Sequence, residues 1–159
     1  MKLTTVLATA AATTTTAVIG SIASQDTNSR WYRKLRKPGF QPPAEVFPIV
    51  WTALYADIAV TSAVAIDEYT DAADFAGRRS YVASLAANLV LNASWSWVFF
   101  KWHRLLPATL LAAALAASTA DLTRRTAEAS PAAGAALAPY AGWTGFATIL
   151  TGRIRQLNR

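Results

Sequence analysis

Residues 81–100, YVASLAANLVLNASWSWVFF, form a run of 20 residues without a charged side chain. About 20 mostly apolar residues are what a helix needs to cross the hydrocarbon core of a bilayer. The run also contains two asparagines, Asn88 and Asn92, whose amides are costly in hydrocarbon unless they face other helices. This stretch therefore predicts a membrane-spanning helix with one polar, inward-facing side.

Four other apolar stretches of similar length flank this one, at residues 3–24, 46–66, 105–122 and 132–151. Residues 3–24 also fit a secretory signal peptide, but the stretch is long and only Lys2 provides a positive start, which favours a helix that stays. Pro139 lies inside the last stretch and predicts a local distortion. We expect an all-α integral membrane protein, a five-transmembrane-helix bundle forming one domain over residues 1–159.

The composition supports this fold class. The chain is 53% hydrophobic and 15% charged, whereas soluble domains carry about 25% charged residues. The formal net charge is +6, but the basic residues gather between the apolar stretches, which favours loops at an anionic membrane surface over a nucleic-acid partner. With no cysteine and a single histidine, His103, the sequence excludes disulfides, thiolate chemistry and His-rich metal centres.

The distribution of basic residues predicts an orientation. Of the 15 Lys and Arg residues, ten lie on the side that holds residues 25–44 and the C-terminus, and five lie on the other side. The positive-inside rule then places the C-terminus in the cytoplasm and the N-terminus outside. This topology suits a prokaryotic inner (cell) membrane.

Three of the stretches present aromatic residues at helical spacing, some with polar neighbours. These residues are Phe47, Trp51, Leu54 and Tyr55 in the first, Asn88, Asn92, Trp95, Ser96 and Phe99 in the second, and Tyr140, Trp143, Ala147 and Leu150 in the third. Such stripes are typical of two arrangements. One is simple packing between helices, and the other is an apolar pocket with a few polar groups for a flat hydrophobic ligand.

Asp57 is an ionisable residue inside the second stretch. Such a residue is by default a functional hypothesis, here proton-coupled transport. A partner on another helix, or a position near the membrane surface, explains it equally well. No paired carboxylates face each other on any span, and neither a Ser/His/Asp set nor a Gly-rich phosphate loop is recognisable, so conventional side-chain catalysis is not expected.

Three groups of motifs occur along the chain in a specific order. They are Trp31-Tyr32-x-x-Leu35-x-Lys37-Pro38 with Pro42-Pro43 and Val46-Phe47-Pro48-x-x-Trp51-Thr52-x-Leu54-Tyr55, then Leu91-Asn92-x-x-Trp95-Ser96-x-x-Phe99-Phe100, then Pro139-Tyr140-x-x-Trp143-x-x-Phe146-Ala147. This pattern resembles the TspO/MBR family of tryptophan-rich sensory proteins and translocator proteins, also called peripheral-type benzodiazepine receptors. Among the departures, Phe40 replaces a frequent Trp, and Gly152 replaces the Tyr of the animal members' sterol-recognition stretch.

The resemblance implies a homodimer in contact with membrane lipid, and a cavity closed by residues 25–44 as a lid. It implies binding of porphyrins such as protoporphyrin IX, haem and other lipophilic molecules, with no required cofactor and no metal. Together with Phe47 from the aromatic stripe, the pocket residues that it implies are Tyr32, Pro42, Trp51, Asn92, Trp95, Ser96, Trp143 and Ala147. Two alternatives remain: light- and oxygen-dependent porphyrin degradation involving Trp51 and Trp143, and proton-coupled transport.

Overall fold

The computed structural model of the chain describes the backbone of residues 1–159 and all side chains except those of Asp26 and Asn28. Five long helices dominate it: α1 (Leu3–Ser24), α3 (Val46–Asp71), α4 (Phe75–Ser96), α5 (Leu105–Ala129) and α6 (Pro131–Leu157). Three short elements complete it: the 3-10 turn η1 (Gln25–Asn28), the helix α2 (Arg30–Lys34) and the π-helical turn η2 (Trp97–Lys101).

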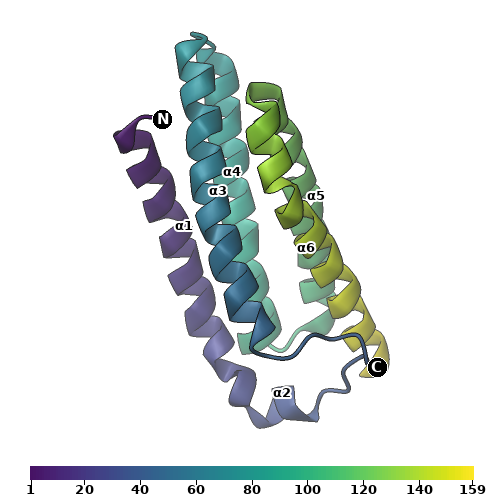
Figure 1. Cartoon of the computed structure of the whole chain (residues 1–159). Coiled ribbons are helices and arrows are strands. Elements are labelled where there is room, and N and C mark those ends of the chain that lie inside the picture. The colour runs from purple at the N-terminus through teal and green to yellow at the C-terminus, as the bar shows by residue number, and fades with distance from the viewer.

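The long helices run up and down in one bundle, with the two termini at opposite ends (Figure 1). α1 packs on α3 and α4, and α5 packs along α6 and also contacts α4. After α2, the chain crosses the lower end of the bundle toward the C-terminus and returns to the start of α3 (Figure 1). The short connections between α3 and α4, α4 and α5, and α5 and α6 make these neighbours antiparallel.

Four of the long helices are long and apolar enough to cross a membrane: α1, α3, α4 extended by η2, and α5. α6 is equally long but does not reach the same apolarity, because Gly, Pro, Thr and aromatic residues interrupt its Ala and Leu residues. The prediction of an all-helical membrane protein is therefore confirmed, whereas the fifth span stays a prediction. α6 runs as one helix through Pro139.

α1 coincides with the predicted span. α3, α5 and α6 continue past the predicted C-terminal ends by about one to two turns, and α4 begins about one to two turns before the predicted start and passes into η2 at Trp97. The length of an apolar run reflects the thickness of the hydrocarbon core, whereas the helix itself extends beyond that run to its capping residues. Asp74 accepts a hydrogen bond from the Gly77 N–H at the start of α4 (2.8 Å), and Ser130 accepts one from the Ala133 N–H at the start of α6 (3.4 Å).

The first turn of α1 is tied to α3 by one buried carboxylate. Asp67 accepts hydrogen bonds from the Lys2 backbone N–H and from the Thr5 hydroxyl, the latter at 2.7 Å. Asp67 thus caps a helix to which it does not belong. Further along, the Thr9 hydroxyl of α1 donates to the Ala59 carbonyl of α3 at 2.8 Å. These contacts make α1 an integral wall of the bundle.

Candidate ligand-binding cavity

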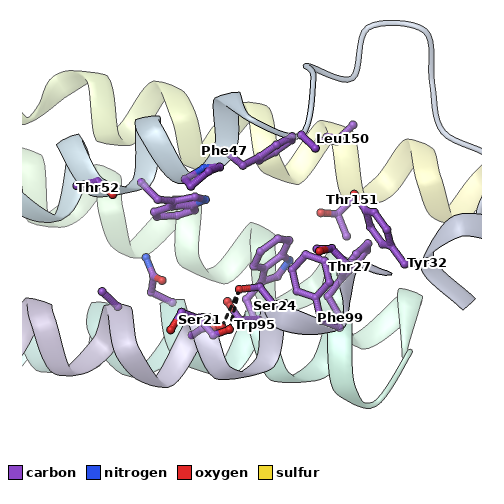
Figure 2. A pocket seen from close by; sticks show the side chains of 18 of the residues that line it. Ser21, Ser24, Thr27, Tyr32, Phe47, Thr52, Trp95, Phe99, Leu150 and Thr151 are labelled. Atoms are coloured by element: carbon purple, nitrogen blue, oxygen red, sulfur yellow. Dashed lines mark hydrogen bonds between the residues drawn. The ribbon is translucent and has the colours of Figure 1, made fainter. Parts of the chain in front are cut away.

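A cavity of about 450 Å³ lies among α1, α3, α4 and α6, at the end of the bundle that the segment before α3 crosses. Small-molecule sites typically enclose about 300–1,000 Å³. Rings make up much of the wall, and Figure 2 shows several of them facing the hydroxyl-bearing end of α1. The aromatic lining residues are Tyr32, Phe47, Trp51, Tyr55, Trp95, Phe99 and Phe100. The polar ones are Ser21, Ser24, Thr27, Gln41, Thr52, Asn92, Ser96 and Thr151.

The structure brings most of the sequence-predicted site residues to this wall. The lining contains Tyr32, Phe47, Trp51, Asn92, Trp95 and Ser96. Three others are not lining residues: Pro42, Trp143 and Ala147 are each half-buried outside the wall. Trp143 lies behind Trp51, with ring centroids 6.5 Å apart and planes at 85°, and contacts Phe47 at 5.8 Å. Trp143 therefore supports two wall residues from behind.

On α4, the aromatic wall is shaped by the π-helical turn η2, which follows Ser96 directly. Trp95 stacks on Phe99 with ring centroids 5.5 Å apart, and Phe99 meets Phe100 edge-on at 4.8 Å. A π-helical turn is wider than an α-helical one and is frequent at functional sites. Here it carries the two consecutive rings of Phe99 and Phe100, both of which line the cavity.

A chain of hydrogen bonds runs from the cavity wall into the bundle. The Tyr55 hydroxyl donates to Asn92 Oδ1 at 2.8 Å, and Asn92 Nδ2 donates to the Tyr140 hydroxyl at 3.0 Å. Tyr140 donates to Asn88 Oδ1 at 2.8 Å, and Asn88 Nδ2 donates to Thr119 at 3.0 Å. Because each member is partnered, the asparagines are tolerated inside an apolar bundle and the orientation of Asn92 is fixed.

Two lining residues carry buried polar atoms that lack a hydrogen-bond partner among the described residues: Trp95 Nε1, a donor, and Gln41 Oε1, an acceptor. Buried polar atoms in folded proteins are nearly always partnered, so such exceptions require an explanation. A bound molecule with its own donor and acceptor groups would satisfy both. Trp143 Nε1, behind the wall, is a further buried donor without a partner.

The segment between α1 and α3, called here the lid segment, contributes to one end of the cavity wall. Thr27, Tyr32, Gln41 and Ala44 all line the cavity from this segment. The Tyr32 ring lies 5.7 Å from that of Phe100, and Lys37 Nζ lies 4.1 Å from the Tyr32 ring centroid. Burial raises the pKa of the Tyr32 hydroxyl, and the hydrogen bond from Gln41 partly offsets this effect. Tyr32 therefore stays neutral at physiological pH.

Two contacts hold the lid segment against the bundle. Trp31 of α2 stacks on His103 with ring centroids 4.0 Å apart and planes at 16°. His103 itself lies in the exposed α4–α5 connection with φ 55°. At the C-terminus, Asn158 Oδ1 accepts from the Arg36 N–H at 2.9 Å, and Asn158 Nδ2 donates to the Arg36 carbonyl at 2.8 Å.

The α1 wall was not predicted from the sequence. It is formed by Ala17, Gly20, Ser21 and Ser24, which carry no motif and no unusual chemistry. The only signal available was their small size at helical spacing, which is weak in a stretch rich in Ala and Thr. Asp57 is half-buried on α3 and is not among the lining residues. In the described part of the chain, no cluster of His, Cys, Asp and Glu could hold a metal ion.

Comparison with known proteins finds a matching family and several relatives. The family model described as "TspO/MBR family" matches residues 6–157. The chain is 31% identical to the uncharacterized membrane protein YtaB of Bacillus subtilis over 131 residues, which cover 82% of each chain. It is 30% identical to the tryptophan-rich sensory protein of Cereibacter sphaeroides over 142 residues (89% of this chain, 84% of the relative). It is 33% identical to the translocator protein of Ovis aries over 137 residues (82% and 76%).

The family-model match over residues 6–157 extends over all five long helices, and the motifs at residues 31–55, 91–100 and 139–147 all lie within it. The same region includes every lining residue of the cavity. The chain belongs to the TspO/MBR family of membrane proteins.

Proposed function

We propose that the protein is a membrane receptor or sensor whose cavity binds tetrapyrroles, such as protoporphyrin IX and haem, and other flat lipophilic molecules. The observation that carries the proposal is the composition of the cavity wall, where aromatic rings of α2, α3 and α4 surround a space suited to a small molecule. Aromatic faces bind flat apolar ligands through stacking and burial of apolar surface. Asn92, the unpartnered Trp95 Nε1 and Gln41 Oε1 add polar contacts.

The basic residues of the lid segment indicate which end of the proposed ligand lies at the cavity mouth. Lys37 lies over Tyr32, a lining residue, and Arg33 is exposed on the adjoining α2. In this proposal, their cations meet the propionates of a porphyrin at the cavity mouth while the macrocycle is buried. Charge-assisted contacts at the mouth favour anionic tetrapyrroles over neutral molecules of the same shape.

The proposal includes five spans in a prokaryotic inner membrane, with the N-terminus outside and the lid and C-terminus cytoplasmic. The five long helices of similar length and the opposite placement of the termini support it (Figure 1). So does the excess of Lys and Arg at the end that contains the lid. A homodimer is part of the same proposal.

A second candidate function is light- and oxygen-dependent degradation of the bound porphyrin. One observation favours it: Trp51 lines the cavity and its ring contacts that of Trp143, so two oxidisable indoles lie next to each other beside the ligand space. If the protein degrades the porphyrin, illumination of the complex should yield a new absorbing species. The species would then be absent from the Trp51→Phe/Trp143→Phe variant, while dark binding would persist.

The binding proposal is tested by titrating the detergent-purified protein with protoporphyrin IX in the dark, followed by porphyrin absorption. We expect saturable binding, with a Kd that rises about three- to tenfold in Trp51→Phe because stacking area is lost. Trp102→Phe is the matched control, since Trp102 is 64% exposed and does not line the cavity. Unsaturable uptake, or equal Kd values for wild type and Trp51→Phe, would contradict the proposal.

A further inference from the structure

A second hollow of about 410 Å³ lies between α1 and α4, near the opposite end of the bundle from the cavity. Its α1 wall consists of Thr and Ala side chains between Thr4 and Ala12. Its α4 wall consists of Val, Leu and Ala side chains between Val82 and Leu89, and Ile66 of α3 is also a lining residue. Arg78 is the only charged residue of the lining. The hollow is thus an apolar groove, called here the α1–α4 groove, with one cation at its end.

The length of the α1–α4 groove matches one leaflet of a bilayer. From Arg78 to Leu89, α4 advances eleven residues, or about 16 Å at the rise of an α-helix. Half of a typical hydrocarbon core is about 15 Å. Arg78 lies in the first turn of α4, so the cation is at the surface end of the groove and the apolar walls lead toward the middle of the bundle.

The Arg78 guanidinium has no carboxylate within ion-pair distance among the described residues, although acidic residues lie close by in the sequence. Three of those acids are engaged elsewhere. Asp67 accepts from Lys2 N and Thr5, Asp71 pairs with Lys2 Nζ, and Asp74 caps the start of α4. Arg78 is therefore an exposed cation at the end of an apolar groove, with its donors available to an external anion.

We propose that the α1–α4 groove binds one acyl chain of an anionic phospholipid, with the Arg78 guanidinium on its phosphate. The groove lies on helices that are apolar enough for membrane insertion, so its surroundings supply acyl chains. Charge complementarity at Arg78 selects an anionic headgroup, and the groove length selects a chain that fills one leaflet. This site is separate from the cavity and does not depend on tetrapyrrole binding.

The test is native mass spectrometry of the full chain released from detergent after exposure to phosphatidylglycerol or phosphatidylcholine. We expect wild type to retain one phosphatidylglycerol per protomer, and Arg78→Gln to show about fivefold lower occupancy. Arg79→Gln is the matched control, because Arg79 neighbours Arg78 but does not line the groove. It should behave as wild type. Retention of phosphatidylcholine should be weaker and insensitive to Arg78→Gln.

A second variant fills the groove without touching the cation. Ala86 lines the groove and is exposed, so Ala86→Trp should fold while displacing the acyl chain, and retention of phosphatidylglycerol should fall. Circular dichroism verifies the fold. Equal retention in wild type and Arg78→Gln, or equal losses in Arg78→Gln and Arg79→Gln, would overturn the proposal. A changed monomer–dimer ratio in Ala86→Trp with unchanged lipid would instead show that a second copy covers the groove.

Discussion

The Tyr140 hydroxyl bridges both buried asparagines of α4, since it donates to Asn88 and accepts from Asn92. The two asparagines were predicted to face the bundle interior because amides are costly in hydrocarbon, and this prediction is confirmed: Asn88 is 0% and Asn92 2% exposed. Tyr55 extends the same chain of hydrogen bonds to the cavity wall. The Tyr140 hydroxyl in the core therefore bonds to two amides, those of Asn88 and Asn92, whereas among the described residues the Tyr55 hydroxyl at the cavity wall bonds only to that of Asn92.

We therefore expect Tyr140→Phe to destabilise the protein more than Tyr55→Phe. The first change leaves Asn88 Oδ1 and Asn92 Nδ2 without their shared partner in a fully buried position, at a cost of about 1–2 kcal/mol. The second removes one hydrogen bond beside a cavity, where a ligand or water can replace it. Thermal unfolding in detergent compares the two variants directly. Equal melting temperatures of the two variants would show that the Tyr140 hydroxyl contributes no more to stability than the Tyr55 hydroxyl.

Single residues also show the limit of the sequence prediction of the site. A helical stripe gives the direction in which a side chain points but not its depth, so Trp51 and Trp143 were equivalent in sequence. In the structure, Trp51 is a lining residue and Trp143 contacts it from the other side. On the α4 stripe, Trp95, Ser96 and Phe99 project from one helix face and all three line the cavity.

At the scale of elements, α5 and α6 approach each other closely at Gly134, and no sequence pattern predicted this contact. A Cβ added to Gly134 of α6 would lie 2.4 Å from Ala127 Cβ and 2.5 Å from Ala127 Cα on α5. Small residues allow helix backbones in membranes to approach closely. In a chain so rich in alanine, no pattern distinguished Gly134 from the other glycines of α6. Glycine is necessary at position 134 because the backbone of α5 lies so close to it, and this closeness depends on how the two helices pack.

Gly134→Ala should consequently lower the melting temperature, because the backbone of α5 must move to admit the methyl group. Gly142→Ala on the same helix is the matched control, since a Cβ there would meet nothing within 4 Å. Alanine has the higher helix propensity, by up to about 1 kcal/mol, so Gly142→Ala should leave stability unchanged or raise it. A Gly134→Ala variant as stable as Gly142→Ala would contradict the close packing of α5 on α6.

The long helices could be predicted from the sequence, because an apolar run marks each of them. The start and end of α1 were predicted correctly, and the other long helices were found but with ends that were too short, because caps such as Asp74 and Ser130 lie outside the apolar runs. The π-helical turn η2 and the short helix α2 were not predicted. Both depend on packing with partners distant in sequence, such as the stacking of Trp31 on His103.

On the scale of the whole molecule, the cavity is a product of distant parts of the chain. Its wall combines α1, the lid segment, α3, α4 and α6, and none of these elements encloses a space by itself. The motifs located the aromatic part of this wall, since they lie on the predicted spans. The contribution of α1 and the closure of the lid by Asn158 depend on how the helices assemble, and local sequence patterns carry no information on that.

The contact between Asn158 and Arg36 joins the C-terminus to the lid, 122 residues apart in sequence. Its two hydrogen bonds use the backbone N–H and carbonyl of Arg36, so they constrain the lid backbone regardless of the arginine side chain. Asn158 is itself fixed by α6, because its Nδ2 also donates to the Ile154 carbonyl at 2.7 Å. The end of α6 thus holds the segment that covers the cavity.

Asn158→Ala should therefore open the lid more often without altering the cavity wall. Loss of two hydrogen bonds of about 1 kcal/mol each would raise the open population by up to about 30-fold. Trypsin should cleave the basic lid segment at residues 30–36 faster, and bound protoporphyrin IX should dissociate faster in stopped-flow measurements. Gln156→Ala is the control, since Gln156 bonds only to the exposed Arg153 among the described residues. If both variants are cleaved at the wild-type rate, the lid is held by the Trp31–His103 stack and the other aromatic contacts, and the C-terminus plays no part in its closure.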